Sequence, residues 1–468
     1  MNGLRRASAV ALLAMMACVL ADVVYPSLIL RFGARGLLLA YVALEWPPMA
    51  TNARIVLGVA AAMTAAFAAL RGSPAAAIAT ALDNGTFFAT FFANQFFLRE
   101  AARTSRLVAR CSSFFINQPP QRRYGLLTLG GYLFGMIVNL GVLSLLGLMI
   151  KRRNTLAAAD GNETIRAIRE RRMVLALLRG FSVTPLASPM SMSLAVLLTA
   201  LPGLRWGTMV SLGLASGALL LGLGWLVDWL GGPRPTPGRQ LNAESESDYP
   251  ALAGVTLIVM AVLVLANLLE WLLAVPLGRA ILVALPMVGL GWLATQYWLY
   301  GPVKGGLLLG RRIVGNAAKT FPLYRSEIAI LAGAGFIGSL FAAFVPPDAL
   351  AALLAAPWLP PLALAPALMI AVTLAGLLGI NPIVAVTILA SALKAAAPPA
   401  VPLETLALAL MIGWSITINC SALTASAMIM ADLVKTTAKT IVLGWNGVYS
   451  ALAVLMTAAW LVGLGVLL

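Results

Sequence analysis

Long apolar runs, bounded by Arg, Lys, Gly or Pro, limit what this chain can fold into. Of its 468 residues 61% are hydrophobic and 10% are charged, and the runs repeatedly approach the roughly 20 residues that a helix needs to cross a bilayer. A soluble core does not need runs of this length. We therefore predict an all-α polytopic membrane protein with about 11–14 membrane segments, some of them half-helices or re-entrant hairpins, because Gly and Pro interrupt them.

The chain is strongly basic, with 32 Lys and Arg residues against 16 Asp and Glu residues and a formal charge of +16. Most of these cations lie in loops between apolar runs, as the positive-inside rule describes, so nucleic-acid binding is not expected. The rule places the basic loop 151–172 in the cytoplasm. One conflict remains: if the apolar segment 124–150 crosses the membrane once, Arg122 and Arg123 lie outside.

The residue types needed for most membrane enzymes are scarce. Histidine is absent, and Cys18, Cys111 and Cys420 are isolated in the sequence, so neither a zinc site nor a disulfide framework is indicated. We expect no enzymatic activity and no cofactor. The abundance of Ala, Leu and Gly, with Arg preferred over Lys, is typical of a high-GC bacterium, and we expect a multi-pass protein of the bacterial inner membrane.

Composition divides the chain into five parts. Polar or interrupted stretches separate N-terminal membrane segments, a first transporter-like unit, a polar linker, connecting membrane segments and a second transporter-like unit. In that order, these parts are residues 1–72, 73–230, 231–249, 250–320 and 321–468.

Two interrupted stretches look alike. Residues 188–203 (SPMSMSLAVLLTALPG) align without gaps with residues 381–396 (NPIVAVTILASALKAA), each as a polar residue and a proline followed by an apolar helix. Chance alignment of Ala- and Leu-rich helices is the alternative. Paired interruptions in two halves indicate the binding site of a secondary transporter, because a broken helix exposes backbone groups that lipid cannot satisfy. The N-termini of half-helices also present partial positive charge to an anion.

A third interruption, in residues 413–430 (GWSITINCSALTASAMIM), crowds small polar residues into one apolar segment. Hydroxyls and amides can coordinate a dehydrated cation or bind a carboxylate, although close packing of helices explains such residues as well. No carboxylate or histidine lies beside the first two interruptions, so we expect sodium rather than a proton as the coupling ion. The candidate solute- and ion-binding residues are Ser188, Pro189, Ser191, Asn381, Pro382, Thr387, Thr417, Asn419 and Ser421.

This layout resembles the ion transporter superfamily, which includes arsenite, dicarboxylate, citrate and TRAP-type membrane subunits. The stretches that carry the resemblance are an early glycine-led span with a Ser/Arg end (83–110), two hairpin tips (180–198 and 376–393) and a late unwound segment (415–426). The resemblance implies two inverted repeats, a scaffold with a mobile transport unit, and secondary transport of small anions. The Ser-Asn-Thr triplet usual at the hairpin tips is missing, since the two tips read ASP at 187–189 and INP at 380–382.

The sequence thus predicts a sodium-coupled symporter for a small anionic solute that works by alternating access. Its expected partners are the solute and the lipid bilayer, and a homodimer is kept as an option. Two other functions stay open: a non-transporting component or flippase of an envelope or export complex, and a membrane-embedded enzyme acting on a lipid-linked substrate.

Overall fold

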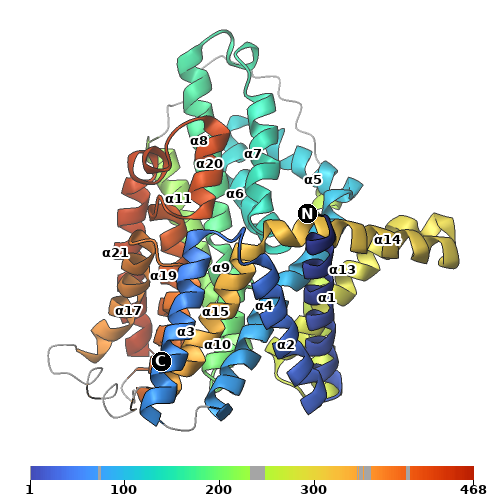
Figure 1. Cartoon of the computed structure of the whole chain (residues 1–468). Helices are drawn as coiled ribbons and strands as arrows, with labels where there is room; N and C mark the ends of the chain where they lie inside the picture. Colours follow the sequence, from blue (N-terminus) through green and yellow to red (C-terminus); the bar gives the residue numbers. More distant parts are fainter. Residues whose placement is uncertain are drawn as a thin grey trace.

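The computed structural model describes residues 2–71, 75–231, 248–344, 360–396 and 401–467, with the single residues 346 and 352. In these residues every regular element is a helix (Figure 1). Nine helical stretches among them are long and apolar enough to cross a membrane. The prediction of an all-α polytopic fold is confirmed, whereas the predicted linker 231–249 lies mostly outside the described residues.

Two helices, α4 and α15, pack along each other in the middle of the molecule (Figure 1). Glycine on both helices allows the close approach: a Cβ at Gly85 would lie 3.0 Å from the carbonyl oxygen of Ala332, and one at Gly335 would lie 2.8 Å from that of Asn84. Around this pair lie two helical hairpins, α1–α2 and α12–α13, and the helices α3 and α14. The bounds are α1 (Asn2–Val24), α2 (Leu28–Glu45), α3 (Thr51–Arg71), α4 (Ala75–Arg103), α12 (Tyr249–Leu273), α13 (Leu277–Tyr297), α14 (Pro302–Thr320) and α15 (Arg325–Phe344).

The rest of the described chain repeats one succession of elements: two short helices joined by a tight turn, a helix broken in its course, and a long helix. The first occurrence consists of α6 (Pro120–Val138), α7 (Gly141–Arg153), α8 (Glu163–Ser182), α9 (Thr184–Ala187), α10 (Met192–Ala200) and α11 (Trp206–Gly231). The second consists of α17 (Pro361–Leu377), α18 (Pro382–Ala396), α19 (Leu403–Cys420), α20 (Ala425–Val434) and α21 (Gly447–Leu467). Between them and the other helices lie α5 (Arg106–Ile116), η1 (Ala157–Ala159), η2 (Trp298–Tyr300), η3 (Phe321–Leu323) and η4 (Thr440–Trp445).

The α6–α7 pair is a re-entrant hairpin, which resolves the conflict in the charge pattern. Its chain reverses at Asn139, whose φ of 55° lies in the left-handed region. Arg123 at the start of α6 lies near enough to Arg169 and Arg172 to be repelled by them. The segment 124–150 therefore enters and leaves on one side, and the cations before and after it share that side, as the positive-inside rule requires.

The two broken helices run in opposite directions. Residues 163–200 (α8 to α10) and 403–434 (α19 to α20) each form one interrupted span, and Figure 1 shows α10 and α20 near opposite ends of the bundle. The expectation of a hairpin tip at 180–198 is therefore wrong, because the chain continues there instead of reversing. The matching hairpins are α6–α7 and α17–α18, so the alignment of 188–203 with 381–396 compared a broken helix with a hairpin.

Candidate functional site

The two broken helices carry several identical residues at the same distances from their breaks. Residues 175–193 (LALLRGFSVTPLASPMSMS) align without gaps with 408–426 (LALMIGWSITINCSALTAS). This match joins like elements, so it is a better repeat than the one drawn from the sequence alone. Gly180, Ser182, Thr184, Ser188 and Ser193 recur as Gly413, Ser415, Thr417, Ser421 and Ser426.

A buried serine opens each break. Ser188 and Ser421 both have extended backbone, and each hydroxyl accepts a hydrogen bond from the N–H two residues later, at 3.3 Å from Met190 and 3.2 Å from Leu423. Ser421 also donates to the carbonyl oxygen of Gly376 at 2.7 Å, which fastens the second break to α17. These bonds hold backbone that is not helical inside the bundle, where lipid cannot satisfy it.

A hydroxyl caps the half-helix after each break. The Ser191 hydroxyl accepts the N–H of Leu194 at the start of α10, and the Thr424 hydroxyl accepts the N–H of Ala427 at the start of α20, both at 3.3 Å. Each cap satisfies one of the free N–H groups of its helix N-terminus. The remaining N–H groups and the helix dipole favour negative charge at both ends.

Each broken helix packs tightly on the first arm of its own hairpin. A Cβ at Gly180 would lie 2.0 Å from the carbonyl oxygen of Thr128 in α6, and one at Gly413 would lie 2.6 Å from that of Met369 in α17. Further along, Gly135 of α6 faces Thr184 as Gly376 of α17 faces Thr417. The same two contacts thus recur in both units, and neither leaves room for a larger side chain.

The hairpin tips differ in their surroundings. At the first tip, Asn139 donates to Gln95 of α4 at 3.0 Å, and the same Gln95 oxygen accepts from Arg99 at 2.9 Å. At the second tip Asn381 is exposed and its side chain accepts only the N–H of Ile383, at 3.1 Å. An exposed amide at the end of two half-length helices is free to meet a solute. Asn139 occupies the matching turn in the first unit. Its place inside the apolar run 124–150 predicts a hydrogen bond to a neighbouring helix, and the bond to Gln95 of α4 confirms that prediction.

The predicted site residues fall into two groups. Ser188, Pro189 and Ser191 lie at the first break, while Asn381 and Pro382 form the second tip near Ser421. Among the described residues no bond joins the side chains of the two groups.

Two predicted site residues have packing roles. Thr387 packs against Gly338 of α15 and donates to the carbonyl oxygen of Ile383. Thr417 donates to the carbonyl oxygen of Gly413 at 2.8 Å. Neither hydroxyl proton is free for a ligand in this arrangement.

A buried arginine connects the two units. Arg179 of α8 is 2% exposed, and it donates to Asn446 at 2.8 Å, to the hydroxyl of Tyr124 at 2.9 Å and to the carbonyl oxygen of Gly224 at 3.0 Å, with its guanidinium 4.3 Å from the ring of Tyr449. All these partners are neutral, so the positive charge is not cancelled by a described carboxylate. An ionised side chain inside a membrane bundle is costly, so Arg179 is a candidate functional residue.

The same network reaches the second break. The amide of Asn446 donates to the side-chain oxygen of Asn419 at 3.1 Å, so Asn419 is tied through Asn446 to Arg179. The predicted Asn419 is therefore part of a polar network and not an isolated ligand. The signal for Arg179 was present in the sequence as one cation inside the apolar run 173–187.

Two buried hydroxyls in the helices that lead into the breaks have no hydrogen-bond partner. These are Thr184 Oγ1 in α9 and Ser415 Oγ in α19, and on the neighbouring α4 the same holds for Thr90 Oγ1 and Asn94 Oδ1. Buried polar atoms are almost always satisfied by protein, water, an ion or a ligand. The breaks therefore supply oxygen atoms that can serve a bound ion or solute.

Comparison with solved structures identifies proteins that have a similar fold. No family model and no curated protein matches the chain. The solved YdaH transporter of Alcanivorax borkumensis is similar over 88% of this chain and 96% of its own, at 14% identity and a TM-score of 0.53. MtrF of Neisseria gonorrhoeae, described with a class of antimetabolite efflux pumps, is similar over 81% and 82%, at 15% identity and a TM-score of 0.51. The chain is thus a multi-pass membrane protein with the fold of these two transport proteins.

Proposed function

We propose that this chain is a secondary transporter that moves a small anionic solute across the bacterial inner membrane by alternating access. The observation that carries the proposal is the duplicated broken helix, with the same serine, cap and glycine contacts in both copies. Non-helical backbone at membrane depth is tolerated where it is buried in protein or lines a water-filled cavity, and discontinuous helices of this kind form the substrate sites of many secondary transporters. The fold shared with two transport proteins supports the same conclusion.

We also propose that the two units are inverted repeats and that the chain is a distant member of the ion transporter superfamily. The repeated order of elements supports this, as do the opposite positions of α10 and α20 in Figure 1. Contacts exchanged between the units point the same way, because α10 packs on α18 and α20 packs on α7. Such an exchange couples each half-helix to the hairpin of the other unit, as alternating access between two halves needs.

Charge supports an anionic solute. Arg179 brings a positive charge into the bundle without a described carboxylate, and the capped N-termini of α10 and α20 add partial positive charge. For the coupling ion we propose sodium, because hydroxyl and carbonyl oxygens gather at the breaks. These oxygens suit a dehydrated hard cation better than a proton.

The test is uptake into proteoliposomes of purified protein, with a panel of radiolabelled small carboxylates and oxyanions. An inward sodium gradient should drive uptake of at least one of them, and collapsing the gradient should stop it. The reverse gradient should be run as well, since one protein of this fold is described with efflux pumps. No gradient-dependent movement of any anion in either direction contradicts the proposal.

A matched pair of variants separates the site from the fold. The double variant Ser188→Ala with Asn381→Ala changes one residue at the first break and one at the second hairpin tip. It should lower uptake at least tenfold, which corresponds to about 1.4 kcal/mol of lost binding free energy. Ser211→Ala with Asn267→Ala makes the same changes on exposed faces of α11 and α12 and should leave uptake unchanged. Equal uptake by both double variants removes Ser188 and Asn381 from the site.

A further inference from the structure

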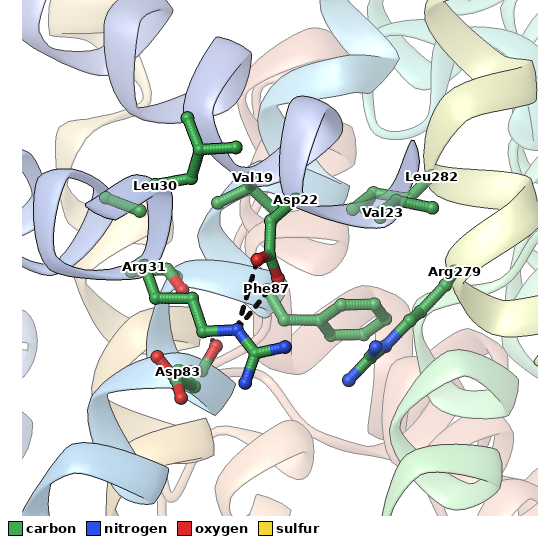
Figure 2. Close-up of a pocket in the computed structure, with 11 residues that line it drawn as sticks. Val19, Asp22, Val23, Leu30, Arg31, Asp83, Phe87, Arg279 and Leu282 are labelled. Carbon is green, nitrogen blue, oxygen red and sulfur yellow. Dashed lines mark hydrogen bonds and ion pairs between the residues drawn. The ribbon is translucent and has the colours of Figure 1, made fainter. Parts of the chain in front are cut away.

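A small charged cavity lies where α1, α2, α4 and α13 meet, apart from both broken helices (Figure 2). Its volume is about 80 Å³. On this measure a single water molecule needs about 10–15 Å³. The cavity therefore has room for a small polyatomic ion or for the phosphate of a lipid headgroup.

Two arginines turn toward this cavity. The Nε atom of Arg31 lies 3.1 Å from Asp22, which leaves its terminal nitrogens pointing away from that carboxylate. Figure 2 shows these nitrogens and the guanidinium of Arg279 facing the same space beside Phe87. Two converging guanidinium groups suit an anion with several oxygens, which they can bind through paired N–H groups.

The charges around the cavity do not cancel. Asp22 pairs with Arg31, and Asp83 pairs with Arg35 at 2.7 Å, so both carboxylates already have a cation. Arg279 makes no hydrogen bond or ion pair with any described residue, and it lies in the first turn of α13, where the helix dipole adds positive charge. Together with Arg35, the charged groups around the cavity therefore carry one positive charge in excess.

The surroundings of the cavity suit a bound phospholipid. The cavity is formed by the end of α1 and the beginnings of α2 and α13, at one end of the membrane-crossing helices. Beside it Tyr25 and Ile29 are 76% and 82% exposed, which gives apolar surface next to a cationic pocket. This pairing of apolar surface and arginine is what a phospholipid with an anionic headgroup needs.

We infer that this cavity binds a phosphate group between Arg31 and Arg279. A phospholipid headgroup and free inorganic phosphate present the same chemistry, and one experiment tells them apart. The site does not depend on the proposed transport function.

The test uses the purified full chain in neutral detergent, delipidated, with three probes: phosphatidic acid, diacylglycerol with the same acyl chains, and inorganic phosphate. Phosphatidic acid should raise the thermal unfolding midpoint and diacylglycerol should not, because only the former carries the phosphate. If inorganic phosphate alone raises it equally, the ligand is the free anion; if it does not, the ligand is the lipid. Equal effects of phosphatidic acid and diacylglycerol, or no effect of any probe, overturn the inference.

Variants locate the binding. Arg279→Gln should weaken binding of the active probe about tenfold, measured by titration of the midpoint, because it removes a charge-assisted hydrogen bond. Arg279→Lys should keep part of the affinity. Arg205→Gln removes another exposed cation, between α10 and α11, and should change nothing. Arg279 is exposed, so the fold does not depend on it, and unchanged affinity in Arg279→Gln contradicts the assignment.

Discussion

The broken helices α8–α10 and α19–α20 share the residues that shape them and differ in the residue that carries charge. Both have a glycine against a hairpin, a buried serine at the break and a hydroxyl cap on the following half-helix. One position before the shared glycine, the first copy has Arg179 and the second has Ile412. Different residues therefore determine the shape of a broken helix and its charge.

The residue that differs, Arg179, links the two copies. Arg179 from the first reaches Asn446, which holds Asn419 at the end of the second. Position 186, which matches Asn419 in the alignment, is a leucine and has no such link. A single asymmetric network thus ties two similar units together, and the units are otherwise held by repeated packing. Mutations can therefore test separately the packing residues that both copies share and the network residues that only one copy has.

The largest expected effect comes from the shared glycines. Gly180→Ala puts a Cβ 2.0 Å from a backbone carbonyl, and Gly413→Ala puts one 2.6 Å from another. Neither backbone can move cheaply, so Gly180→Ala should lose at least the roughly 3 kcal/mol at the upper end of overpacking costs, and Gly413→Ala about 2 kcal/mol. Thermal unfolding and the monodisperse fraction in detergent measure both.

A third glycine provides the control for that pair. Gly222 of α11 has open space around its Cβ position, and Gly222→Ala should be neutral or slightly stabilising, since alanine favours a helix. A smaller loss of stability for Gly180→Ala than for Gly413→Ala would contradict the prediction, because the shorter distance should carry the larger cost.

The second effect concerns the charged residue that is not shared. Arg179→Met keeps most of the side-chain length but removes the donors to Asn446, Tyr124 and Gly224, so the protein should lose about 1–3 kcal/mol for the unsatisfied acceptors. If the charge attracts the anion, uptake should fall at least tenfold beyond what the lost stability explains. Uptake is compared per folded protein, from the monodisperse fraction.

Two further variants sharpen this result. Arg179→Lys keeps the charge and should retain part of the uptake, with a weaker network because lysine lacks the planar fork of donors. Ile412→Met changes the matching position of the second helix without altering charge and should leave uptake intact. Full uptake in Arg179→Met contradicts the role of this charge in anion transport.

Much of the fold could be predicted from the sequence because bilayer crossing leaves a local signal. Length and hydropathy were enough for an all-α polytopic protein, and the interruptions near 188, 381 and 421 are present in the structure. Whether the chain reverses or continues at an interruption was not predictable in the same way. Pro189 and Pro382 both follow a polar residue, yet one lies in a continuing span and the other at a hairpin tip.

The missed features depend on contacts between distant segments. The 124–150 segment was long enough for one crossing, and only the turn at Asn139 makes it a hairpin. Arg179 finds its hydrogen-bond partners 45 to 267 residues away, so no local pattern reveals them. The glycine in each copy was visible, but the close approach that requires it depends on where the hairpin lies.

The third prediction compares the stability lost when the serine at the start of each break is replaced. Ser421 both accepts from Leu423 and donates to Gly376, whereas Ser188 makes only the first kind of bond. One net hydrogen bond contributes about 1 kcal/mol, so Ser421→Ala should cost about that much more stability than Ser188→Ala. Unfolding midpoints in detergent measure the difference. Equal losses mean that the bond to α17 adds nothing, and the two breaks are then alike in strength.

The smallest expected difference lies between the two caps. Ser191→Ala and Thr424→Ala each remove a hydroxyl that accepts an N–H at 3.3 Å, so each should lose about 1 kcal/mol, the usual value for an N-cap. Because the bond lengths and the positions in the helices match, the two losses should be equal within the error of the measurement. Ser191→Asp and Thr424→Asp then test charge at the same places: a carboxylate can still accept the N–H, but it repels an anionic solute, so uptake per folded protein should fall below that of the alanine variants. Equal uptake per folded protein in the aspartate and alanine variants would mean that the solute does not approach these helix ends, and it would leave the caps with a purely structural role in both copies.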